Sequence, residues 1–260
     1  MSILPSARMP ALFVGHGSPM NALEDNAFSR GWAEVGERIP WPKAILAISA
    51  HWETDGPAVT IDEAPQTIHD FGRSFPQALF DAQYPAPGSP SLAARTAQLL
   101  APRAVRPALD WGLDHGAWSV LVRMFPEPVI PVVQFSLDRS ASPEEHYAMG
   151  RALAPLRDEG VLVMGSGDIV HNLDVDFRKP DAPDWARRFN DEAKRLILAD
   201  DHLALAAYED LGEDAALSIN SAEHYLPLLY VLGAARPDDP IRFFNDELMG
   251  AVSMTSVLIG

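Results

Sequence analysis

Short apolar runs alternate along this chain with longer stretches of helical periodicity, and this alternation limits the fold more than any other feature. It is typical of an α/β domain built on a mostly parallel sheet. The predicted strands are Ala11–Val14, Ala44–Ala50, Ala58–Ile61, Val129–Phe135 and Val161–Met164. The predicted helices are Ser91–Leu100, Trp118–Phe125, Pro143–Arg157, Asp184–Ala199 and Ala222–Leu232. We therefore expect an α/β fold whose central, mostly parallel sheet is flanked by helices.

No internal repeat, low-complexity tract or Gly/Ser linker divides the 260 residues, so we expect a single catalytic domain over residues 1–260. Residues 62–90 depart from the rhythm, because they hold five prolines, three Phe and one Tyr. This segment is too apolar for a linker and too rich in proline for a regular element. A long structured loop of this kind is usually functional.

The charge and the absence of cysteine exclude several classes of function. Lys and Arg number 20 against 36 Asp and Glu, which gives a formal net charge of −16. Such a surface repels phosphate backbones and anionic lipids, so we expect no nucleic-acid or membrane partner. With no cysteine, any metal must be held by His, Asp or Glu. Neither a signal peptide nor a membrane helix is recognisable in the sequence, and we expect a cytoplasmic protein of open oligomeric state.

The placement of the histidines points to a metal site. His16 and His51 directly follow the first two predicted strands, and His171 comes shortly after the strand Val161–Met164. Ligands of open α/β sheets bind at the carboxyl ends of the strands, so these side chains are expected to converge there. His224 begins a predicted amphipathic helix. Imidazoles without thiolates suit one divalent ion, Zn²⁺ or Fe²⁺, at the carboxyl edge of the sheet.

Several ordered sequence blocks carry a family resemblance. Together they resemble the DODA-type extradiol aromatic ring-opening dioxygenases, the 4,5-DOPA dioxygenase group of the class III extradiol superfamily. The blocks are GHGSPMNALEDN (15–26), ISAHW (48–52), HDFGRSFP (69–76), YPAPGSP (84–90), LDHGAWSVL (113–121), GSGDIVHNL (165–173) and EHYLPLLYVLG (223–233). They cover most of the chain, and as a set they are specific.

The resemblance implies a non-haem metal enzyme that cleaves a catechol ring and inserts both atoms of O₂. It implies metal ligands at His16, His51 and His224, with His171 as either a further ligand or an acid–base group. His115 matches a histidine that acts on substrate or oxygen without holding the metal. We therefore expect His115 and His171 to carry the catalytic proton transfers, because imidazole titrates near neutral pH.

Further residues are candidates for the substrate pocket. We expect His69, Trp52 and Phe71 to contact the substrate, with Phe75 and Tyr84 as further apolar walls. Four other positions have two alternative roles each. Asp114 and Asp168 either orient nearby imidazoles or have capping and solvated roles, and His146 and His202 are interpreted as surface or structural residues.

Three alternatives compete with this reading. A tetrapyrrole chelatase also opens with a strand and an HGS-like turn, although the blocks DHGAW and EHYLP argue against it. A non-catalytic metal-binding member of the same fold is the second alternative. Dinucleotide binding at GSGDIVHN is the weakest, because the third glycine of the G-x-G-x-x-G pattern is missing.

Overall fold

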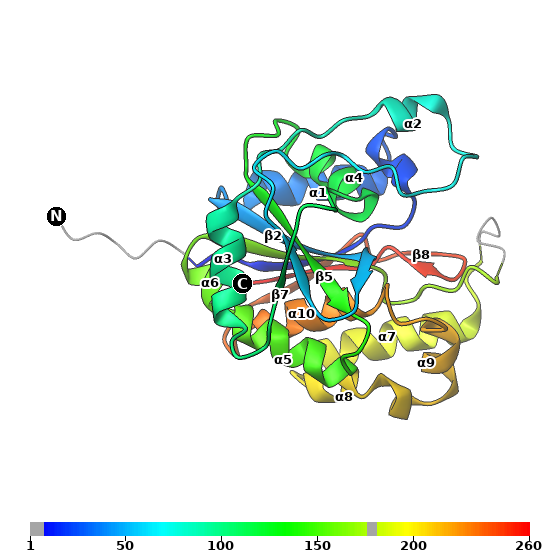
Figure 1. The fold of residues 1–260 in the computed structure, drawn as a ribbon. Coiled ribbons are helices and arrows are strands. Elements are labelled where there is room, and N and C mark those ends of the chain that lie inside the picture. Colours follow the sequence, from blue (N-terminus) through cyan, green and yellow to red (C-terminus); the bar gives the residue numbers. More distant parts are fainter. Residues whose placement is uncertain (1–7, 176–180) are drawn as a thin grey trace.

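The computed structural model describes residues 8–175 and 181–260 (Figure 1). The first seven residues, which belong to the segment where no signal peptide was recognised, lie outside the described part. An eight-stranded sheet has the order β4-β3-β5-β2-β6-β1-β10-β7, and β8 and β9 form a separate ribbon. The strands are β1 Ala11–Gly15, β2 Ala44–Thr54, β3 Ala58–Thr60, β4 Arg106–Ala108, β5 Val132–Asp138, β6 Val161–Gly167, β7 Ile241–Phe244, β8 Leu248–Met249, β9 Val252–Ser253 and β10 Ser256–Ile259.

The central strands β5, β2, β6 and β1 are mutually parallel, which confirms the expected mostly parallel sheet. Antiparallel pairs occur toward the edges, where β10 joins β1 to β7 and β3 pairs with β5. The α-helices are α1 Ala27–Arg38, α2 Gln77–Asp81, α3 Pro90–Leu99, α4 His115–Met124, α5 Pro143–Leu153, α6 Pro155–Asp158, α7 Asp184–Leu198, α8 His202–Ala206, α9 Glu213–Ser218 and α10 Leu226–Ala234. Two 3₁₀ turns complete the list, η1 Pro19–Ala22 and η2 Tyr208–Leu211. Among the described residues, no helix is long and apolar enough to span a bilayer.

The continuously apolar strands are explained by burial on both faces of the sheet. Leu46 and Ile48 of β2 belong to the core on the side of α5 and α10, whereas Ile45 and Ala47 belong to the core formed with α1 and α4. Figure 1 shows these two helix layers on opposite sides of the sheet. Strands covered on both faces need no polar alternation. Polar side chains therefore collect at the strand ends, where the candidate site lies.

Several predicted boundaries move in the structure, among them those of β2, α4 and α5. The second predicted strand ends at Ala50, but β2 continues to Thr54, so His51 lies within the strand, two residues beyond the last pairing with β6 at Ser49. The predicted helix Pro143–Arg157 is divided into α5 and α6, because Pro155 has no N–H to continue the helical hydrogen bonds. Helix α4 begins at His115, three residues earlier than predicted.

The two glycines of β6 permit close packing against the start of α10. Gly165 and Gly167 lie inside the extended strand, and a Cβ would meet Pro227 O at 2.5 Å and His224 O at 2.0 Å. Their missing side chains allow the backbone at the start of α10 to approach the strand closely. Helix α10 is buried on all sides rather than amphipathic, and His224 precedes it.

His146 provides a test of this packing. It belongs to α5 and is fully buried against α10, where its Nδ1 lies 2.9 Å from Tyr230 Oη. Its role is therefore structural. Burial lowers the pKa of His146 to about 4, from about 6.5 in an unfolded chain. The neutral form therefore stabilises the fold fully above pH 6.5, and this contribution is lost as the pH falls toward 4.

We expect His146→Gln to remove this pH dependence. Between pH 7 and pH 5, wild type should lose about 2 kcal/mol more free energy of unfolding than the variant. Denaturant titrations at both pH values measure the difference. An equal loss in both proteins would contradict the assignment.

Candidate metal centre and active site

A cavity of about 440 Å³ opens at the carboxyl edge of the parallel strands. Five histidines from separate parts of the chain line it: His16, His51, His115, His171 and His224. The remaining lining residues are mostly apolar: Gly17, Ser18, Pro19, Phe71, Phe75, Leu173, Met249 and Val252. The structure therefore brings together all five histidines that the sequence singled out.

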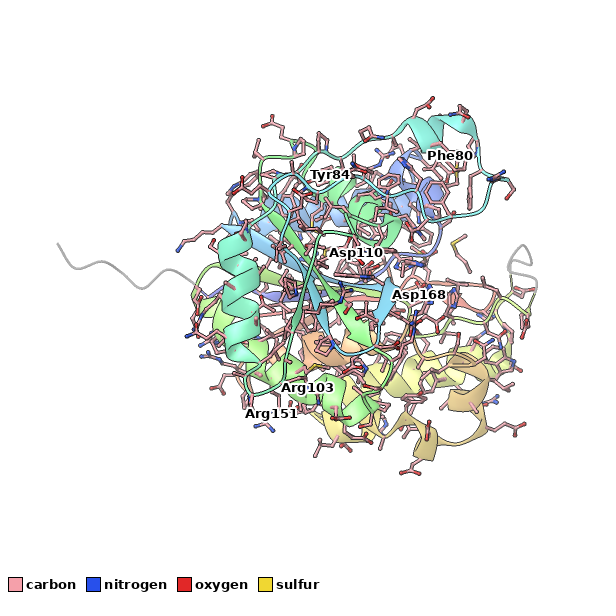
Figure 2. The ribbon with its side chains drawn as sticks, viewed as in Figure 1. Phe80, Tyr84, Arg103, Asp110, Arg151 and Asp168 are labelled. Carbon is pink, nitrogen blue, oxygen red and sulfur yellow. The ribbon has the colours of Figure 1, made fainter. Side chains whose placement is uncertain are left out.

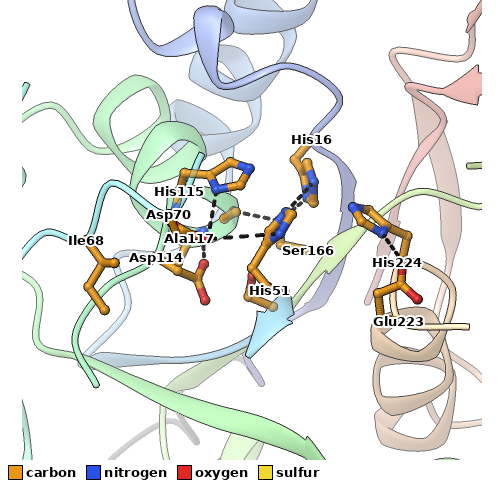
Figure 3. A network of polar contacts seen from close by, with 12 residues as sticks. His16, His51, Ile68, Asp70, Asp114, His115, Ala117, Ser166, Glu223 and His224 are labelled. Atoms are coloured by element: carbon orange, nitrogen blue, oxygen red, sulfur yellow. Dashed lines mark hydrogen bonds and ion pairs between the residues drawn. The ribbon is translucent and has the colours of Figure 1, made fainter. Parts of the chain in front are cut away.

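His16 and His51 face each other across the end of the sheet, with their Nε2 atoms 3.1 Å apart (Figure 3). The hydroxyl of Ser166 donates to Gly116 O, so its oxygen accepts from Nδ1 of His16 at 3.0 Å. That bond places the proton of His16 on Nδ1 and leaves the Nε2 lone pair directed toward His51.

His224 is held in the same way by its neighbour. Nδ1 of His224 donates to Glu223 Oε1 at 3.0 Å, which leaves its Nε2 free. Burial acts to raise the pKa of Glu223, but the bonds from His224 and Ser221 dominate and lower it to about 2. His171 lies parallel to His224, with ring centroids 3.5 Å apart. Burial, followed by the nearby His224, lowers the pKa of His171 to about 3.

These imidazoles are suited to bind one divalent ion. Burial is the largest cause that lowers the pKa of His16 and of His51 well below 6.5, and the neighbouring histidines lower both further. Neutral imidazoles offer lone pairs, and adjacent nitrogens bound at 2.0–2.1 Å to one ion lie about 3.0–3.4 Å apart. The Nε2 separation of 3.1 Å between His16 and His51 fits that requirement.

His115 is positioned by a carboxylate that the sequence interpretation did not connect with it. Asp114 forms the N-cap of α4, and His115 is the first residue of that helix. Asp70 Oδ1 accepts from the backbone N of His115 at 2.8 Å. Asp70 Oδ2 lies 2.9 Å from Nδ1 of His115, out of line with the ring N–H bond. The two residues are 45 positions apart, so no local motif could have revealed this contact.

Two buried carboxylates complete the polar surroundings. Asp114 accepts from Gln134 Nε2 at 2.7 Å and from Ala117 N at 3.2 Å, so it is not solvated. Asp168 Oδ1 accepts from Gly17 N at 3.2 Å. Burial raises the pKa of both carboxyls, that of Asp168 strongly.

Some residues predicted to contact substrate lie elsewhere. Trp52 stacks on Trp111 at 5.6 Å, outside the lining of the cavity, and Tyr84 is a core residue whose hydroxyl donates to Phe125 O. His69 also lies outside the lining, with its Nε2 bonded to Ala82 O at 2.9 Å.

The long loop does deliver Phe71 and Phe75 to the cavity, as its composition suggested. The sequence interpretation missed the rim residues. Leu173 follows the GSGDIVHN segment, whereas Met249 and Val252 come from the β8–β9 ribbon. Leu173 and Met249 are 58% and 44% exposed. Their apolar character carries no signal until the fold brings them beside the histidines.

Known proteins are similar to this chain in both sequence and fold. Residues 10–256 match the family described as the catalytic LigB subunit of aromatic ring-opening dioxygenase. The chain is 50% identical to a protein of Escherichia coli (strain K12) named 4,5-DOPA dioxygenase extradiol, across 99% of this chain and 97% of that protein. A Beta vulgaris protein of the same name is 39% identical, with 92% of each chain covered. A crystal structure of an uncharacterized protein from Escherichia coli K12 has a TM-score of 0.85 and 45% identity, covering 97% of this chain and all of the other.

The chain therefore belongs to the family of the catalytic LigB subunit of aromatic ring-opening dioxygenase. Within that class it is an extradiol ring-cleavage dioxygenase of the DODA type, which confirms the resemblance seen in the sequence blocks.

The Glu223–His224 pair leads to a prediction about metal affinity. We expect Glu223→Gln to weaken Zn²⁺ binding about 10- to 100-fold, because the neutral amide is a weaker acceptor for the Nδ1–H of His224. Competition with a chromophoric chelator measures the effect. Glu213→Gln, the same change at an exposed position of α9, is the control. Equal affinities in the two variants would show that Glu223 does not support the ligand.

Proposed function

We propose that this enzyme uses one divalent metal ion, Fe²⁺ or Zn²⁺, to open a catechol ring with insertion of both atoms of O₂. The convergence of five histidines, three of them buried and two half-buried, in one largely apolar cavity carries this proposal. Relatives named 4,5-DOPA dioxygenase extradiol support a DOPA-like or other catechol as the substrate. A cytoplasmic location and a single catalytic domain over residues 1–260 remain predictions that accompany it.

His16, His51 and His224 are the proposed metal ligands. Each turns a ring nitrogen toward the cavity, and Ser166 and Glu223 hold the opposite nitrogens of His16 and His224. A metal bound there would supply a Lewis acid for the two catechol oxygens, and iron would also supply the electron transfer to O₂. Three protein ligands leave at least the two positions that both catechol oxygens require.

His171 and His115 are the proposed acid–base residues. Among the described residues, donor atoms within 4.8 Å of one another group His171 with His224 and Glu223, whereas His115 is grouped with His16 and His51. Both histidines therefore lie beside the proposed ligands, where they can transfer protons to or from a bound catechol. His115 lies against the ring of His51, with centroids 3.9 Å apart, where it can exchange a proton with a bound catechol.

The aromatic side chains of the loop provide the apolar wall for the ring. Phe71 packs edge-on against His115, with ring centroids 5.6 Å apart, and against Phe75, with ring centroids 5.4 Å apart. These residues can cover the face of a planar substrate and exclude water from the proton-transfer groups.

The proposed function is tested by anaerobic loading with Fe²⁺, followed by addition of O₂ and L-DOPA or catechol. Oxygen uptake matched by growth of a yellow semialdehyde absorbance is the expected result. His51→Ala should lose metal and activity together, whereas His115→Ala should retain the metal and turn over more slowly. Stoichiometric metal binding without oxygen uptake on a panel of catechols would instead support the chelatase or the non-catalytic alternative.

Asp70 gives a separate prediction about His115. In Asp70→Asn, the amide oxygen can still accept from His115 N, but its NH₂ group would face Nδ1 and favour the wrong tautomer. We expect kcat to fall about 10²- to 10⁴-fold, with KM and metal content unchanged. Asp81→Asn, at an exposed position of α2, is the matched control. A variant with normal kcat would remove Asp70 from the positioning of His115.

A further inference from the structure

The carboxylate of Asp168 lies buried directly after β6, in the interior of the molecule (Figure 2). Its side chain has no exposed surface. Oδ1 accepts one hydrogen bond, from Gly17 N at 3.2 Å, whereas Oδ2 has no hydrogen-bond partner. A buried polar atom without a partner calls for an explanation, and an ion is among the usual ones.

Asp168 lies on the side of His16 that faces the proposed metal. Oδ2 is 3.8 Å from Nε2 of His16, and that same Nε2 lies 3.1 Å from His51. Ser166 already holds the opposite nitrogen, so Asp168 does not orient the imidazole from behind. Donor atoms of His16, Asp168 and His224 all lie within 4.8 Å of one another.

The electrostatics of this position favour a bound cation. Over residues 8–175 and 181–260, the only ion-pair contact of Asp168 is the 3.8 Å approach of Oδ2 to Nε2 of His16. A carboxylate buried without a positive partner is costly, whereas a divalent ion at its free oxygen would compensate the charge.

We propose that Oδ2 of Asp168 binds the metal ion beside His16 and His224. The inference rests on the proposed metal-dependent function. One ion at 2.0–2.2 Å from each donor can span the 3.8 Å between Oδ2 and Nε2 of His16. The carboxylate would halve the formal charge of a bound dication. Mixed histidine and carboxylate donors favour Fe²⁺.

The test is the metal affinity of Asp168→Asn, measured by chelator competition with Zn²⁺ and, under anaerobic conditions, with Fe²⁺. Asn keeps the shape and the bond from Gly17 N but removes the anionic oxygen. We expect at least a 10-fold loss of affinity for both ions. Asp138→Asn, which changes an equally buried carboxylate at the end of β5 outside the potential ligand groups, should bind as wild type does. Wild-type affinity in Asp168→Asn would overturn the proposal.

A second measurement does not depend on how the variant folds. In a crystal structure of the Zn²⁺-loaded wild type, Oδ2 within 2.5 Å of the ion supports the assignment, and any longer distance overturns it. A wild-type protein that binds no metal would overturn the proposed function itself. A structure in which Zn²⁺ is bound without contact to Asp168 would overturn only the role of Asp168 and would leave the proposed ring-cleaving function standing.

Discussion

The close approach of the backbone before α10 to strand β6 is the contact on which the site depends. Gly165 and Gly167 leave no side chain between the strand and the residues around His224, and the backbone N of Asp168 donates to His224 O at 2.8 Å. His16, at the end of β1, is bonded through its own N to Gly167 O. The two proposed ligands, from opposite ends of the sequence, are thus hydrogen-bonded to the adjacent backbone residues Gly167 and Asp168. A side chain at Gly167 would separate them.

Polar groups behind the imidazoles determine how the rings are oriented. Ser166 and Glu223 each hold an Nδ1 atom, and Asp70 lies beside that of His115. Because the surrounding cavity is largely apolar, burial lowers the pKa of His16 well below 6.5 and favours its neutral form. The acidic composition of the chain is also seen at the site. Three carboxylates, those of Asp70, Asp168 and Glu223, lie beside the cluster of histidines.

The sequence predicted the parallel centre of the sheet and the convergence of His16, His51 and His171, because apolar runs and strand ends are local signals. The places of His115 and His224 at the site were expected from the family resemblance. It did not predict helix α1, which follows the Asn26 cap, or the joining of β10 to β1. It also could not connect Asp70 with His115, or bring Met249 to the cavity, because those contacts depend on how loops close over long separations. Trp52 and His69 illustrate the converse, since proximity in sequence to His51 or Phe71 did not place them in the pocket.

The rim of the cavity has a different origin from its floor. The floor consists of histidines on or beside strands that form the core of the protein, so most changes there would disturb folding as well as chemistry. Leu173 and Met249 are exposed and belong to a loop and a two-stranded ribbon. Surface substitutions usually change stability by less than 0.5 kcal/mol. Substitutions at the rim are therefore expected to reshape the mouth of the cavity at little cost in stability, while the histidines at its floor keep their positions.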